Sequence, residues 1–236
     1  MKQVINMVWW IKVCLRGIVL LGALLLVGCL QYDLDVQFDS QTHGQFLQQM
    51  HWRGGAIASE AKLSPWLQFL TERTEAVGGK LKLLPDNGLE VTVPFNNGRD
   101  LEARFNQFFN PSEADIPFTL PSGEPIQAEL ALQQGNWVVA INNHIYLCID
   151  LTAIPDLKET GLPLLQTAQL LEGKITLTTP WGVTASLPEI PSAGTWSLTA
   201  GEVNQFEADF WVPSPIGIGA IAIGMLVAIG YGVKYW

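Results

Sequence analysis

The sequence has few of the side chains on which most enzyme active sites depend. Among 236 residues there are three histidines and three cysteines. It contains no Gly-x-Ser-x-Gly, no phosphate-binding glycine loop before a helix, no Cys-x-x-Cys and no paired histidines at metal-ligand spacing. We therefore expect a protein that is not an enzyme and that carries no metal or cofactor.

Basic residues are also scarce. Thirteen Lys and Arg stand against 22 Asp and Glu, for a formal net charge of -9. Three of the basic residues, Lys2, Lys12 and Arg16, precede Cys29, which leaves ten against 22 and a net charge of -12 from Cys29 onward. Such a chain repels phosphate backbones, so we expect no nucleic-acid partner.

The N-terminal segment is typical of an export signal. After Arg16 an uncharged run reaches Gly28, which is too short for a full membrane crossing. The run ends in Leu26-Val27-Gly28-Cys29, which resembles the lipobox of bacterial lipoproteins. Residues 1–28 are therefore predicted to be a lipoprotein signal peptide, and Cys29 to be the lipidation site. The alternative is an uncleaved signal anchor with an incidental cysteine.

The C-terminal segment predicts a membrane-spanning helix. Residues 216–233 carry no charge, and 18 helical residues span about 27 Å, close to the hydrocarbon thickness. Trp211 and Tyr231 are typical interfacial anchors, and Lys234 marks the cytoplasmic side. We expect residues 214–236 to form this helix and a short tail, with residues 29–213 as one domain on the extracytoplasmic or lumenal side. A buried core helix is the alternative.

Between the two ends the pattern predicts an α+β domain, with an antiparallel sheet and two main helices packed on it. Residues 32–38 alternate apolar and polar side chains, and a hairpin with the following strand is expected. Helices are expected from Ser64-Pro65 to Val77, and from a cap at Asp100 to Phe109. The remaining predicted strands are 80–84, 89–95, 126–132, 137–141, 145–151, 173–179, 195–200 and 206–212. Residues 157–171 are predicted to be a loop or a short third helix.

Aromatic side chains are concentrated on the two predicted helices. Trp66 and Phe69 lie on the first, and Phe105 and Phe109 lie on the second. A helix-over-sheet cavity lined in this way could hold an acyl chain or another apolar ligand. These four residues are the candidate ligand-binding residues, and ordinary core packing is the alternative.

Two pairs of polar residues share a predicted strand face. Asp33 and Asp35 could serve acid-base chemistry or bind calcium, or could simply face solvent. His144 and Cys148 have the same parity, but four strand positions separate them by about 13 Å, which excludes direct contact. Cys148 is therefore expected to be a small buried apolar residue.

Two segments resemble LppM-like lipoproteins and the related domain of cyanobacterial and plastid proteins. They are residues 28–38, Gly-Cys-Leu-Gln-Tyr-Asp-Leu-Asp-Val-Gln-Phe, and residues 195–211, which precede the C-terminal helix. The resemblance implies an α+β domain outside the cytoplasmic membrane or in the thylakoid lumen. It also implies an association with lipid, but it carries over no binding residues.

The function expected from these observations is a non-enzymatic module that binds a lipid or apolar ligand at the membrane surface. The alternative is a structural or assembly partner of a membrane protein complex, for which the small residues Ala220, Gly224 and Ala228 offer a helix-packing stripe. With both anchors in one bilayer, the start of strand 32–38 and the end of strand 206–212 should lie on the same side of the domain, as antiparallel neighbours.

Overall fold

The structure, a computed structural model, describes residues 30–52, 60–85, 87–110, 118–120, 125–154, 171–188 and 194–235. In chain order the elements of these ranges are β1 (Leu30–Ser40), β2 (His43–Trp52), α2 (Glu60–Ala76), β3 (Lys80–Leu84), β4 (Gly88–Phe95), α3 (Gly98–Phe109), β5 (Gln127–Trp137), β6 (Ala140–Asp150), β7 (Leu171–Thr178), β8 (Val183–Leu187), β9 (Thr195–Leu198), β10 (Val203–Pro213) and α4 (Pro215–Tyr235). The predicted α+β class is confirmed. The segment predicted as a loop or third helix falls largely on residues 155–170, outside the described residues.

The strands form two sheets rather than the single antiparallel sheet that we expected. The order of the first is β3-β4-β2-β1-β7-β9, and that of the second is β5-β6-β10-β8. Within the described residues every pair is antiparallel except β1 and β7, which run parallel. Strand alternation alone does not report direction, so the sequence could not reveal this pair.

Strand β1 lies inside the first sheet and divides its side chains between two faces. Its alternate apolar residues are 1–5% exposed. These residues are Leu30, Tyr32, Leu34, Val36 and Phe38. Asp33 and Asp35 lie on the other face and are half-buried, as the alternation predicts. The predicted hairpin with β2 is also confirmed.

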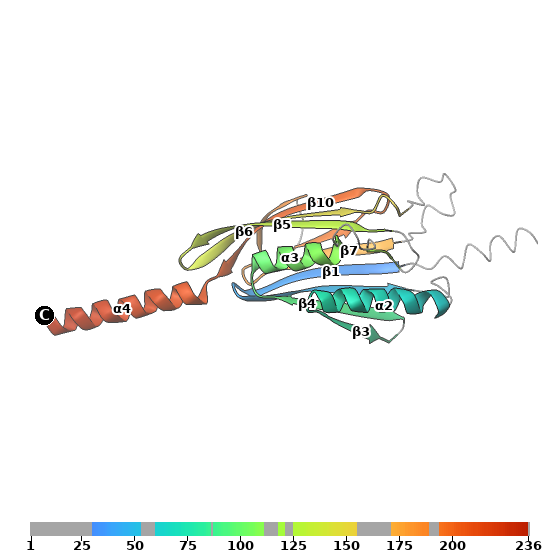
Figure 1. Cartoon of the computed structure of the whole chain (residues 1–236). Coiled ribbons are helices and arrows are strands. Elements are labelled where there is room, and N and C mark those ends of the chain that lie inside the picture. Colours follow the sequence, from blue (N-terminus) through green and yellow to red (C-terminus); the bar gives the residue numbers. More distant parts are fainter. Residues whose placement is uncertain are drawn as a thin grey trace, which may run out of the picture.

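Helices and the second sheet both pack on the apolar face of the first sheet. Phe46 on β2 contacts Phe105 and Phe108 of α3, with ring centroids 5.6 and 5.9 Å apart. Phe38 on β1 contacts Phe210 of β10, with centroids 4.9 Å apart. Helices α2 and α3 thus lie in front of the β1–β4 region, while the second sheet covers the β1–β7 region (Figure 1).

Both helices begin earlier than predicted. Helix α2 starts at Glu60, so Pro65 lies inside it rather than at its start. The N-cap of α3 is Asn97, whose side chain accepts a hydrogen bond from the Asp100 N–H, and not Asp100 as expected. The Asp100 carboxylate instead accepts from the backbone N–H of Asn96 at 2.9 Å. Such reciprocal capping satisfies two donors that would otherwise lack partners.

Strands β5 and β6 form one long hairpin where we predicted three short strands. Strand β5 runs through Gly135 to Trp137, and β6 runs unbroken through Asn142 and Asn143. Asn143 is buried, and its amide hydrogen-bonds to Gln134 and to the Ile141 carbonyl, so a residue typical of turns is accommodated within a strand. Strand β8 was missed, although its five residues, Val-Thr-Ala-Ser-Leu, alternate apolar and polar side chains.

The two ends of the domain lie at opposite poles, so the expectation that they share one side was wrong. Phe38 and Phe210 are in contact, and each lies near the C-terminal end of its strand, so β1 and β10 point the same way. Leu30 precedes Phe38 by eight residues and Pro213 follows Phe210 by three, so about 36 Å separates the poles at 3.3 Å per residue. Helix α4 leaves the domain at the pole where β10 ends (Figure 1).

Helix α3 protects the edge of the second sheet through side-chain amides. Asn106 accepts a hydrogen bond from the Leu130 N–H at 2.9 Å and donates to the Leu130 carbonyl at 2.8 Å, and Asn110 donates to the Ala128 carbonyl. The edge strand β5 therefore has partners along the segment that α3 covers.

We predict that Asn106→Ala lowers the free energy of unfolding by about 2 kcal/mol, because it removes two hydrogen bonds and leaves backbone groups of Leu130 without partners. Gln107→Ala, an exposed neighbour on the same helix, is the control and should change it by less than about 0.5 kcal/mol. Urea unfolding of the full chain in mild detergent measures both, and equal effects would contradict this role.

The outer face of the first sheet contains a carboxyl group with a raised pKa. Burial disfavours the charged form and raises the pKa of Asp35, against the opposing effects of the Thr178 hydroxyl and the Lys174 charge. As the pH rises from below the ordinary value, the unfolded chain releases this proton first, so the native state loses stability.

Accordingly, Asp35→Asn should raise the melting temperature at pH 7 and have little effect at pH 3, where the carboxyl is protonated in both states. Thermal unfolding of the two proteins at both pH values tests this. An equal rise in the melting temperature at pH 3 would show that the charge of Asp35 does not cause the effect.

Candidate functional site

An apolar slot lies between the two sheets. It contains about 270 Å³ of space, part of it open to solvent. One wall comes from the first sheet, through Val36, Ile175, Leu177 and Trp196, and the other comes from the second sheet, through Ile145, Leu147 and Phe206. Residues from five strands, β1, β6, β7, β9 and β10, therefore meet at this slot.

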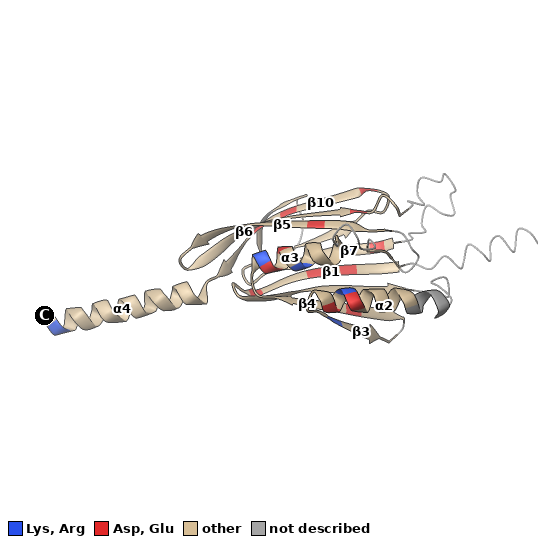
Figure 2. Ribbon diagram, viewed as in Figure 1, with Lys and Arg blue, Asp and Glu red and all other residues tan. Residues whose placement is uncertain are grey.

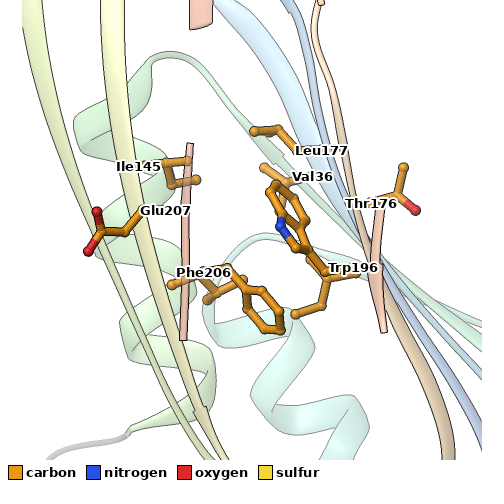
Figure 3. Close-up of a pocket in the computed structure, with 9 residues that line it drawn as sticks. Val36, Ile145, Thr176, Leu177, Trp196, Phe206 and Glu207 are labelled. Carbon is orange, nitrogen blue, oxygen red and sulfur yellow. The ribbon is translucent and has the colours of Figure 1, made fainter. Parts of the chain in front are cut away.

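Among the described residues, the side chains that point into the slot are all aliphatic or aromatic. Thr176 and Glu207 also border it, but their side chains point away from it, on the outer faces of their strands (Figure 3). The ring centroids of Trp196 and Phe206 lie 5.6 Å apart across the gap. The Trp196 indole N–H donates a hydrogen bond to the Pro188 carbonyl at 3.3 Å. An unpaired polar ligand group would lose hydration here, so the slot suits hydrocarbon.

Most of the aromatic candidates predicted from the helices belong to the packed core. Phe105 and Phe109 are 0–1% exposed and in mutual contact at 4.6 Å. Trp66 is also buried and donates to the Thr119 carbonyl, while Phe69 is half-buried beneath the Arg73 guanidinium. The apolar slot lies elsewhere, between the sheets, so a ligand-binding role for these four residues stays a prediction.

Two polar side chains are buried in the core face of the first sheet. The Tyr32 hydroxyl and both amide atoms of Gln48 have no hydrogen-bond partner among the described residues. Gln48 lies opposite Leu34, two pairs along the ladder from Tyr32 and on the same face. Burial raises the pKa of Tyr32, and an unpaired buried group costs about 1–3 kcal/mol. The sequence signal for this feature was the break in alternation at Gln48.

The chemically reactive residues of the second sheet lie on its outer face. The His144 Nδ1 is 3.0 Å from an Asp209 carboxylate oxygen on the neighbouring strand. Cys148 shares this face and is half-buried, so the expectation of a buried apolar cysteine was wrong. Tyr146 lies between them, with a pKa raised by burial and by Cys148. These residues line no described pocket interior and show no nucleophile paired with a base.

Asp33 and Asp35 do not form a free carboxylate pair. A Lys174 nitrogen lies 3.5 Å from Asp33, and the Thr178 hydroxyl donates to Asp35. Within the part of the chain that the structure describes, no three His, Cys, Asp or Glu residues could hold a metal ion together.

Helix α4 has the length and composition needed to cross a membrane. It contains 21 residues, and its most apolar stretch of 18 residues has a mean hydropathy of 2.2 and is only 6% buried. A core helix would be mostly buried, and a signal sequence would lie near the N-terminus, so neither alternative describes α4. The protein is therefore membrane-associated. Cys29 and the predicted signal peptide lie outside the described residues, so lipidation stays a prediction.

Comparison with known proteins places the chain in a family. The structure is similar to the folded domain of LppM from Mycobacterium tuberculosis. The LppM-like lipoproteins, to which two segments of the sequence show a resemblance, take their name from that protein. The TM-score is 0.41 at 12% identity, over 79% of this chain and 91% of that one. A comparison of the sequence with curated proteins found no match. A sequence model of the family described as "Protein of unknown function (DUF3153)" matches residues 34–234, so the chain belongs to that family.

Proposed function

We propose that the domain is a non-enzymatic module that holds a thin hydrocarbon, such as one acyl chain of a lipid, between its two sheets at the membrane surface. The observation that carries this proposal is the apolar slot, whose inward-pointing side chains are all apolar.

The arrangement of reactive groups supports binding rather than catalysis. His144, Asp209 and Cys148 lie on the outer face of the second sheet, while the slot lies on its inner face. A ligand held in the slot would therefore be separated from them by the thickness of the sheet, beyond the reach of proton transfer.

Helix α4 would keep the module beside its source of lipid. Lys234 follows the apolar run, and a basic residue at that position favours the cytoplasmic side for the C-terminus. The domain would then lie on the extracytoplasmic side of the cytoplasmic membrane, or in the lumen if the membrane is a thylakoid.

Filling the slot should prevent lipid entry. The full chain is reconstituted in phosphatidylcholine vesicles in which a fraction of the lipid has a photoreactive diazirine on one acyl chain. After irradiation, mass spectrometry maps adducts to slot residues such as Ile145 and Leu177, with α4 as an internal reference for lipid contact. We expect Val36→Phe, which places a ring in the slot, to reduce slot adducts at least fivefold relative to α4.

Gln37→Phe is the matched control, because it adds the same ring to the next residue, on the opposite face of β1. It should leave slot labelling unchanged. The proposal is wrong if the native chain gives adducts on α4 but none in the slot. Stable recovery of another membrane protein from native membranes, with no lipid in the slot, would favour the alternative of an assembly partner.

A further inference from the structure

The tip of the β5–β6 hairpin exposes large apolar side chains at the pole where α4 begins. Trp137, Val138 and Val139 are 65%, 64% and 43% exposed. From Gln133 to Trp137 every residue of β5 is exposed, so this part of the hairpin extends beyond the core (Figure 1). An apolar cluster of this kind on a domain surface usually marks a contact site.

The hairpin tip is attached to the first turn of α4. The Ser214 N–H donates to the Val139 carbonyl at 2.9 Å, and the Ser214 hydroxyl accepts from the Gly217 N–H at 3.2 Å. The rings of Trp137 and Trp211 lie 6.4 Å apart. The hairpin tip and the start of the membrane helix therefore form one structural unit.

Gly217 makes this close approach possible. A Cβ atom at residue 217 would overlap the Val138 carbonyl, whereas a Cβ atom at Gly219 would meet nothing within 4 Å. The two glycines lie in the same helix, yet only the first is required for contact with the hairpin.

Charge is absent from both segments that form this unit. No Asp, Glu, Lys or Arg occurs between Glu129 and His144, or between Asp209 and Lys234. Figure 2 shows the hairpin tip and α4 free of charged residues as far as Lys234. Tryptophan, aliphatic residues and neutral amides are the composition that the boundary between headgroups and hydrocarbon accepts.

The length of α4 places the hairpin tip at that boundary. Its 21 residues extend about 32 Å at 1.5 Å per residue, which matches a hydrocarbon core of about 30 Å. The first turn of α4 therefore lies where the hydrocarbon begins, and the tip bonded to it lies at the same depth.

We propose that Trp137, Val138 and Val139, together with Trp211, form a second membrane contact that inserts into the interfacial layer of the bilayer that α4 spans. This contact holds the domain upright on the membrane, with its strands along the membrane normal and the Leu30 pole farthest from the surface. The inference does not depend on the apolar slot, which lies elsewhere in the domain.

Photocrosslinking tests the contact directly. Benzoylphenylalanine replaces Val138 in the full chain, which is reconstituted in phosphatidylcholine vesicles. The control places the same group at Val203, which is 47% exposed at the start of β10, near the opposite pole. We expect at least tenfold more lipid adduct at residue 138 than at residue 203. Equal labelling, or adducts to protein only at residue 138, would overturn the proposal.

The glycine pair tests the attachment to α4. With benzoylphenylalanine at residue 138, Gly217→Val should reduce lipid adducts several-fold, because its side chain displaces the hairpin from the helix. Gly219→Val should leave them unchanged. Limited proteolysis verifies that the domain stays folded in both variants. An unchanged adduct yield in folded Gly217→Val would show that the hairpin does not depend on α4 for its depth.

Discussion

The burial of one side of β1 is the constraint on which the domain depends. This strand is hydrogen-bonded to β2 and β7, and Phe38 on its buried side contacts Phe210 of β10. A shift of one residue would turn Asp33 and Asp35 into the core and expose Leu34 and Val36. The ladders to both neighbours and the burial of these side chains therefore fix the register of β1, and that register places Val36 in one wall of the slot.

The division of the cover between helices and a second sheet explains why the cavity and the aromatic cluster are separate. The phenylalanines of α3 fill the space beside Phe46, where a helix stands off from a sheet by the length of large side chains. On the other side of β1 two sheets face each other, and their branched side chains with a single Trp196–Phe206 contact leave a gap. The many aromatic residues on the two predicted helices were thus as consistent with core packing as with ligand binding.

Local patterns predicted what depends on neighbouring residues. The alternation of β1, its hairpin with β2 and the apolar length of α4 could all be read from short windows. The parallel pairing of β1 with β7, the second sheet and the slot could not, because they join residues far apart in the chain. Helix starts were misjudged where a polar residue three positions away offered an equally good cap, as with Asn97 and Asp100.

The common direction of β1 and β10 has a mechanical consequence. The polypeptide chain enters the domain at the pole where β1 starts. It leaves for α4 at the opposite pole, about 36 Å away along the strands. If Cys29 is acylated, its chains are attached one residue from Leu30, so they cannot reach the leaflet that α4 enters while the domain stands upright. Those chains and α4 could share one leaflet only if the domain lay along the membrane. A force between the two ends would then act on the side-chain packing between the sheets, because no hydrogen-bonded ladder joins β1 to β10 among the described strands.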